Sequence, residues 1–184
     1  MSDIESWLRA EVERVARAAF AGLIDAHPEA DFCGYALYSD ASAMTVCCAV
    51  NTRSHLARLE AEAEDPAEAE YYRWTPAEWS MEGTTAEQFA PISRRLRTED
   101  RPDGEFVGFR DGVYEACVAA LESLVAEGAF GAGAGVDADA DHVVVFAVSD
   151  PDDLDPALER EWMRRLNPPG QADRFARWRD AASA

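Results

Sequence analysis

The segment from Tyr71 to Trp79 holds the residues with the greatest capacity for molecular recognition. It reads Tyr-Tyr-Arg-Trp-Thr-Pro-Ala-Glu-Trp and places four aromatic rings within nine residues. Tyr, Trp and Arg are enriched at the centres of protein interfaces because they bury a large area and keep a polar group available. The segment therefore predicts a contact surface, with packing in the core as the alternative. The candidate contact residues are Tyr71, Tyr72, Arg73, Trp74, Glu78 and Trp79.

The aromatic and β-branched character of this segment favours a short strand around residues 71–74, followed by a helical turn at Thr75-Pro76-Ala77-Glu78. Side chains alternate along a strand, so Tyr72 and Trp74 would share one face. We expect this pair to anchor the core. Tyr71, Arg73 and Trp79 would then face outward or line a groove.

Carboxylates, histidines and cysteines supply a catalytic alternative. Glu78 and Glu82 flank Trp79, whose ring can desolvate a carboxyl group and raise its pKa. A Cys–His pair would be a second route, although Cys47 and Cys48 point to opposite faces of a predicted strand. The chain contains no HExxH, CxxC or GxSxG motif. The histidines considered for such a pair are His27, His55 and His142, whereas the four cysteines of an intracellular chain are most simply small buried hydrophobic residues, namely Cys33, Cys47, Cys48 and Cys117.

Two segments resemble ligand-binding loops without meeting their requirements. The acidic run at 137–141 begins like a calcium loop, but the positions that need Gly and Glu hold His142 and Val148. The glycine-rich segment 131–135 leads into a strand, whereas anion-binding loops precede a helix. We therefore expect no metal and no cofactor.

The charge of the chain excludes several classes of function. The formal net charge is −19, and all 17 basic residues are arginine. Without lysine there is no Schiff-base enzyme, no P-loop lysine and no kinase-type phosphate-binding lysine. The excess of negative charge opposes binding to phosphates, so we expect no nucleic-acid partner. The basic residues Arg94, Arg95, Arg97 and Arg101 gather near the end of one predicted helix.

An acidic run precedes the aromatic segment. Between Glu60 and Glu70 the chain carries six carboxylates and no basic residue. Such a run is usually a solvated helix face or loop that aids solubility. The alternative is electrostatic steering toward a basic protein partner. The candidate steering residues are Glu60, Glu62, Glu64 and Asp65.

The expected location follows from what the sequence does not contain. The N-terminal residues show neither the basic nor the apolar region of a signal peptide, and no apolar stretch is long enough to span a bilayer. We expect a cytoplasmic protein with no membrane partner.

Hydrophobic periodicity predicts the elements that must position these residues. Ser2 and Glu5 form a capping-box pattern at the start of the first helix, and His27-Pro28 ends it. The strand at 143–148 is apolar on both faces, which places it in the sheet interior. We expect one α+β domain over residues 1–184, with a mainly antiparallel sheet of about four strands covered by several helices. The predicted helices are 2–26, from 54 onward, 85–96, 106–128, 155–166 and 171–178, and the strands are 32–38, 44–50, 71–74 and 143–148.

Several short motifs occur in order along nearly the whole chain. They are Tyr35-Ala36-Leu37-Tyr38, Asn51-Thr52, Tyr72 to Trp79, Val148-Ser149-Asp150 and Arg165-Leu166-Asn167-Pro168. Together they resemble a bacterial family of domains of unknown function, DUF4303. The resemblance implies a bacterial intracellular domain with no established activity and no catalytic residues to carry over. Small domains of this type are often antitoxin or immunity proteins, which is an association by type.

The leading hypothesis is a non-enzymatic protein-interaction module, with an immunity-like inhibitor of a toxin as its most specific form. Its partner would be a protein, and the acidic run favours a basic one. The alternative is a small hydrolase or transferase that uses a carboxylate such as Glu78, or a Cys–His pair, in a cleft. A third interpretation is a purely structural module in which every aromatic ring is buried.

Overall fold

A mixed four-stranded sheet lies at the centre of the molecule. The computed structural model describes residues 3–99, 104–130, 142–149 and 154–182. Among these residues the strand order is β3-β2-β1-β4, with antiparallel β3–β2 and β2–β1 pairs and a parallel β1–β4 pair. The sheet is thus mostly antiparallel, and the α+β prediction is confirmed. The strands are β1 (Phe32–Asp40), β2 (Val46–Thr52), β3 (Met81–Glu82) and β4 (Val143–Ser149).

The predicted hairpin of the first two strands is confirmed. The side chain of Asp40 shapes its turn, because Oδ1 accepts a hydrogen bond from the Ser42 amide at 2.8 Å and the carboxylate also bonds the Thr45 hydroxyl. Short polar residues that bond the backbone two residues on are typical of such turns. The register pairs Ala36 with Ala49.

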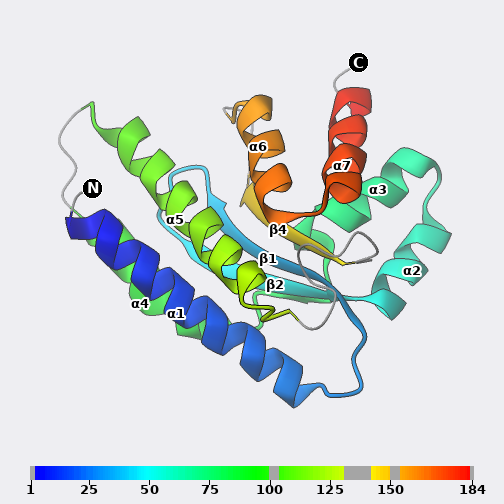
Figure 1. Cartoon of the computed structure of the whole chain (residues 1–184), viewed down its shortest axis with the longest axis horizontal. Helices are drawn as coiled ribbons and strands as arrows, with labels where there is room; N and C mark the ends of the chain where they lie inside the picture. Colours follow the sequence, from blue (N-terminus) through cyan, green and yellow to red (C-terminus); the bar gives the residue numbers. More distant parts are fainter. Residues whose placement is uncertain (1–2, 100–103, 131–141, 150–153, 183–184) are drawn as a thin grey trace.

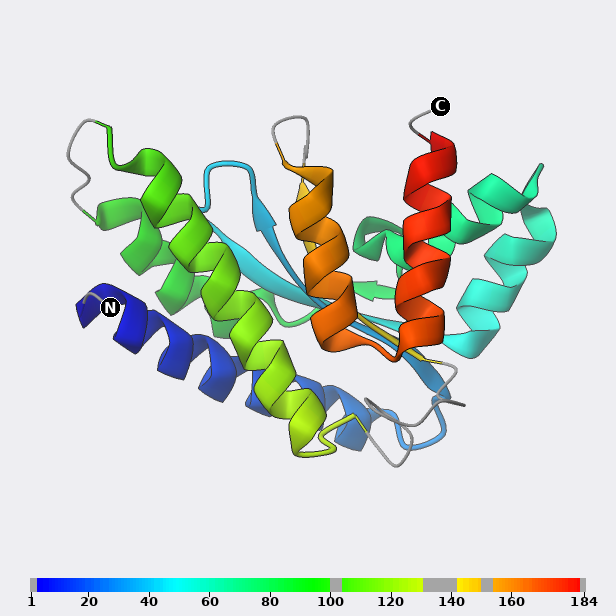
Figure 2. The ribbon, with the colours of Figure 1, turned by 45° about the horizontal axis from the view of Figure 1, so that its top comes forward.

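Three helices cover one face of the sheet (Figures 1 and 2). They are α1 (Asp3–Ala26), α4 (Ala86–Thr98) and α5 (Phe106–Ala126). Phe20, Phe89 and Leu121 pack there with Leu37 and Val50 of the sheet. Gly128, with a φ of 70°, terminates α5 in the left-handed conformation that favours glycine at this position. The predicted first helix is confirmed, while Ser2 of its capping box lies outside the described residues.

A smaller core lies on the opposite face, beneath α3 (Pro66–Trp74), the short helix η1 (Pro76–Glu78) and α7 (Pro169–Ala182). Trp74, Trp79 and Phe175 pack there against Ala36 and Ala49, whose small side chains leave room for the large rings. Helix α6 (Pro156–Leu166) joins the two cores, since Trp162 belongs to the first and Met163 to the second.

The predicted position of the last strand in the sheet interior is wrong, because β4 is an edge strand next to β1. Its side chains are apolar on both faces for a different reason. Val144 and Phe146 belong to the first core, and Val143 and Val145 belong to the second. A strand covered by helices on both faces reads as continuously apolar, whether or not it has two neighbouring strands.

The predicted strand at 71–74 is also wrong, because these residues form the last turn of α3. The side chain of Asp65 caps this helix by accepting hydrogen bonds from the amides of Ala67 and Glu68 at 2.8 and 2.9 Å. Pro66 occupies the first helical position, where its missing N–H costs nothing. The third strand of the sheet is instead the two-residue β3.

The remaining predicted helices are confirmed, and the second one, α2 (Arg53–Glu62), is capped by Thr52. The calcium-like run at 137–141 and the glycine segment 131–135 lie outside the described residues. Within the described ranges, no helix combines the length and the apolar character needed to cross a membrane.

Candidate functional site

Helices α2 and α3 pack together at the end of the molecule opposite the N-terminus (Figures 1 and 2). We call residues 53–74 the α2–α3 hairpin. It contains the whole acidic run and the first half of the aromatic segment. The structure therefore joins the two sequence features that we expected to act together in recognition.

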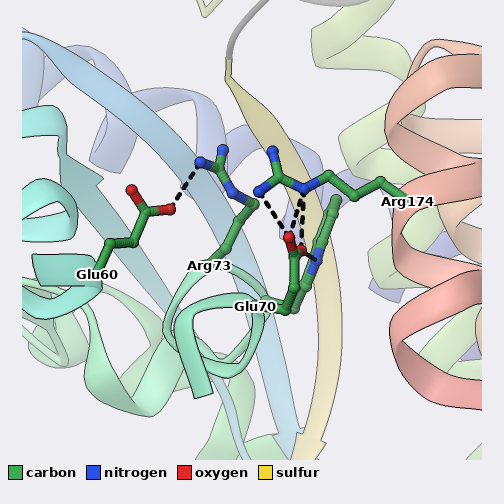
Figure 3. A network of polar contacts seen from close by, with 5 residues as sticks. Glu60, Glu70, Arg73 and Arg174 are labelled. Carbon is green, nitrogen blue, oxygen red and sulfur yellow. Dashed lines mark hydrogen bonds and ion pairs between the residues drawn. The ribbon is translucent and has the colours of Figure 1, made fainter. Parts of the chain in front are cut away.

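A network of ion pairs holds the α2–α3 hairpin on the body of the domain (Figure 3). The Glu70 carboxylate accepts hydrogen bonds from Arg174 Nε at 2.7 and 3.0 Å, and from Trp74 Nε1 at 2.9 Å. Arg73 Nη2 donates to Glu60 Oε1 at 2.8 Å. Helix α3 is thereby tied to α7 on one side and to α2 on the other. The hairpin is a fixed part of the fold.

Arg73, a predicted contact residue, lies inside this network. It is only 8% exposed, and its guanidinium points toward Glu60 (Figure 3). Its Nε is buried and has no hydrogen-bond partner among the described residues. Arg73 therefore acts first in stabilising the hairpin, and the expectation that it faces outward is wrong.

The two tryptophans of the segment are core residues. Trp74 is 3% exposed and packs edge-to-face on Phe175, with ring centroids 5.3 Å apart, as expected for a core anchor. Trp79 is 4% exposed, which contradicts its expected outward or groove position. The turn formed by η1 reverses the chain after Trp74 and directs the second indole onto Gly34 of β1.

The two tyrosines remain accessible. Tyr71 is 40% exposed, and Tyr72 is half-buried and does not anchor the core as predicted. Their rings meet edge-to-face at 5.7 Å. The Tyr71 hydroxyl donates to Glu78 Oε1 at 3.2 Å, and the Tyr72 hydroxyl donates to Glu68 Oε1 at 2.8 Å.

The surroundings of both phenols raise their pKa values. Partial burial, followed by the nearby Glu78 carboxylate, raises the pKa of Tyr71. The hydrogen bond to Glu68 is the main cause that raises the pKa of Tyr72. Both rings are held in defined orientations by carboxylates, which leaves two amphipathic surfaces facing solvent.

The acidic residues of the α2–α3 hairpin fall into two groups. Glu60, Glu62 and Glu70 form ion pairs with Arg73, Arg58 and Arg174. Glu64, Asp65 and Glu68 have no ion-pair partner in the described part of the chain. Two of the four predicted steering residues, Glu64 and Asp65, are thus not engaged in ion pairs among the described residues, and neither is Glu68.

The structure brings together some, but not all, of the residues that we considered for the catalytic alternative. His55 Nε2 lies 2.9 Å from the backbone carbonyl oxygen of Glu78, so the ring bonds the main chain of the predicted carboxylate. Glu82 is exposed and accepts a hydrogen bond from the Tyr38 hydroxyl.

The cysteines of β2 are poor nucleophiles in this setting. Burial raises the pKa of Cys47, and it raises the pKa of Cys48 to about 12. The thiolate is the reactive form of cysteine, and a raised pKa keeps it scarce at neutral pH. Within the described ranges, no group of three or more His, Cys, Asp or Glu side chains is arranged to hold a metal ion.

Comparison with known proteins identifies the family. A family model described as a domain of unknown function (DUF4303) matches residues 12–168. The chain belongs to the DUF4303 family. No curated protein and no solved structure matches it. The DUF4303 match includes the α2–α3 hairpin and ends before α7, so Arg174, which binds Glu70, lies beyond the matched region.

Proposed function

We propose that this DUF4303 protein is a non-enzymatic, cytoplasmic protein-interaction module that binds a basic protein partner through its α2–α3 hairpin. An immunity-like inhibitor of a toxin is the most specific form of this proposal. One observation carries it. The hairpin presents three carboxylates without ion-pair partners in the described chain, Glu64, Asp65 and Glu68, beside the exposed ring of Tyr71.

The fixed position of the hairpin supports a binding role. Association costs free energy for every side chain and loop that must be ordered at the interface. Here Arg73 and Arg174 already hold the two helices through Glu60 and Glu70. The surface is therefore organised before a partner arrives, and little of this cost remains.

The charges and the tyrosines have separate tasks in this proposal. Unpaired carboxylates attract a basic partner over several ångströms and raise the association rate. Tyr71 and Tyr72 contribute rigid, amphipathic contact area that slows dissociation. The formal net charge of −19 favours the same class of partner and opposes nucleic acid and anionic membrane surfaces.

The state of the candidate catalytic groups favours binding over the alternative, a small hydrolase or transferase. The pKa of Cys48 is raised to about 12, and the ring of His55 is occupied by a backbone carbonyl. Glu78 accepts a hydrogen bond from Tyr71. His55 and Glu78 thus connect the hairpin to η1, and Cys48 is buried in the first core.

The test begins with a photo-crosslinking amino acid introduced at Tyr71 in the native host cell. Val107 is the matched control position, because it is exposed in the first turn of α5, outside the hairpin. We expect a discrete protein adduct from position 71 and none from position 107. Crosslinking to the same protein with the same yield from both positions would contradict the proposal.

Kinetics with the purified partner then test the charges. E64Q/D65N removes two negative charges, and Asn retains the capping ability of Asp at residue 65. The control is E161Q/D173N, which removes two exposed carboxylates from α6 and α7 that have no ion pair among the described residues. We expect the first variant to lower the association rate at low salt, with the difference vanishing at high salt. Equal rates for the two variants would refute steering by the hairpin.

A further inference from the structure

A cavity of about 400 Å³ lies on the opposite side of the domain from the α2–α3 hairpin, between α4 and the start of β2. Its size falls within the range of small-molecule binding sites. Cys47 of β2 and Ala86 and Ala90 of α4 form apolar walls. Arg94 and Arg97 of the same helix also line it.

Most polar side chains of the cavity are already engaged. Ser93 bonds the backbone of Val46, with its Oγ 3.2 Å from the amide nitrogen and 3.5 Å from the carbonyl oxygen. Thr98 Oγ1 donates to the Arg94 carbonyl at 3.1 Å, and the Thr45 hydroxyl bonds Asp40. These groups close the edge of β2 and the last turn of α4, so they offer little to a ligand.

The guanidinium groups of Arg94 and Arg97 are the polar groups of the cavity that are not already engaged in this way. Arg94 and Arg97 are three residues apart on α4 and therefore project from the same face of the helix. Both are exposed, and neither forms an ion pair within the described part of the chain. Arg95, between them, is also exposed but is engaged, since it pairs with Glu99 and lies over the ring of Trp7.

The charge environment makes this pair unusual for the molecule. The chain contains 36 acidic residues against 17 basic ones, and most described arginines have a carboxylate partner. No acidic side chain lines the cavity among the described residues. Two cations that have no ion-pair partner among the described residues, beside an apolar cavity, match a ligand with an anionic head and an apolar body. Arginine binds carboxylates through paired hydrogen bonds.

We propose that this cavity binds a small amphiphilic carboxylate. The apolar body lies between α4 and the start of β2, and the carboxylate is bound by Arg94 and Arg97. This site is independent of the hairpin and of the protein partner proposed for it. It gives the domain a second ligand of a different chemical class.

Amide NMR titration of the isotope-labelled protein with phenylbutyrate tests the proposal, and phenylbutanol serves as the neutral analogue. We expect saturable shifts at Val46, Cys47 and Ala90 with the acid, and binding of the alcohol weaker by about tenfold or more. Ala90→Phe fills the cavity and should abolish the shifts.

Matched charge variants complete the experiment. R94Q/R97Q should weaken phenylbutyrate binding by about tenfold or more, because two charge-assisted contacts are lost. R164Q/R177Q removes the same charge from exposed arginines of α6 and α7 and should leave the affinity unchanged. Equal affinities for acid and alcohol, equal effects of the two double variants, or no saturable shift up to about 10 mM ligand would each overturn the proposal.

Discussion

Trp79 lies against Gly34, with its ring atoms Cη2 and Cζ2 3.0 and 3.2 Å from the position that a Cβ atom on Gly34 would occupy. The contact joins the end of the aromatic segment to the central strand β1. A side chain at residue 34 would displace the indole that fills the second core. The buried position of Trp79 therefore depends on the absence of a side chain at Gly34.

Gly34→Ala should lower the free energy of unfolding by about 1–3 kcal/mol, because the added methyl group overpacks a rigid ring. Chemical denaturation measures the change. Gly22→Ala is the control, since a Cβ at that helical position meets nothing within 4 Å and should stabilise the protein by about 0.5–1 kcal/mol. In G34A/W79F the smaller ring makes room for the methyl group, so the two losses should be less than additive. Full additivity would disprove the contact.

Truncation of the buried tryptophan should cost far more stability than truncation of the exposed tyrosine. Trp79→Ala creates a cavity in the second core and should cost about 3–5 kcal/mol. Tyr71→Ala removes a ring that is 40% exposed and should cost less than about 1 kcal/mol. Thermal and chemical unfolding distinguish the two. Tyr71→Ala is consequently the informative variant for partner binding, and a large loss of stability on this change would place Tyr71 in the core.

Two arginines of the hairpin allow a matched comparison of ion pairs. Arg73→Ala leaves Glu60 without its partner at a site where the arginine side chain is 9% exposed, and should cost about 2 kcal/mol or more. Arg58→Ala breaks the pair with Glu62, whose members are 53% and 60% exposed, and should cost about 0.5 kcal/mol or less. The measurement is the free energy of unfolding at low and high salt. Similar losses of unfolding free energy for both variants would show that the burial of Arg73 contributes little to stability.

Stability should fall at alkaline pH. Burial raises the pKa values of Tyr35 and Tyr114 to about 12, above the value of about 10 for an unfolded chain. The folded state thus binds these protons more tightly, and the resulting stability is complete below about pH 10 and is lost as the pH rises toward about 12. Unfolding free energies measured across this range should decline less steeply in Y35F/Y114F. An unchanged slope would contradict the assignment.

The sequence predicted most of the fold because most elements carry strong local patterns. The amphipathic spacing of α1 and α5, and the apolar runs of β1, β2 and β4, identify them without tertiary information. The two-residue strand β3 has no such pattern. The edge position of β4 was missed for a simple reason. A continuously apolar strand indicates that both of its faces are covered, but it does not indicate whether other strands lie on both of its sides.

The site was predicted less well, for reasons visible in particular residues. Aromatic residues at 71–74 favoured a strand, although Asp65-Pro66 already signalled a helix start, and tertiary packing overrode the β propensity. The burial of Trp79 depends on Gly34, which is distant in the chain. Likewise, Arg94 and Arg97 were visible as a basic spot, but their cavity exists only once α4 packs beside β2.

The parallel pairing of β1 with β4 has a consequence for biosynthesis. Gly34 pairs with Val143, so one side of the central strand has no partner until most of the polypeptide has left the ribosome. Until then β1 presents an open row of amide and carbonyl groups, which invites pairing with other chains. Premature termination before β4 should therefore yield aggregates, and assistance by a chaperone during translation would matter most in that interval.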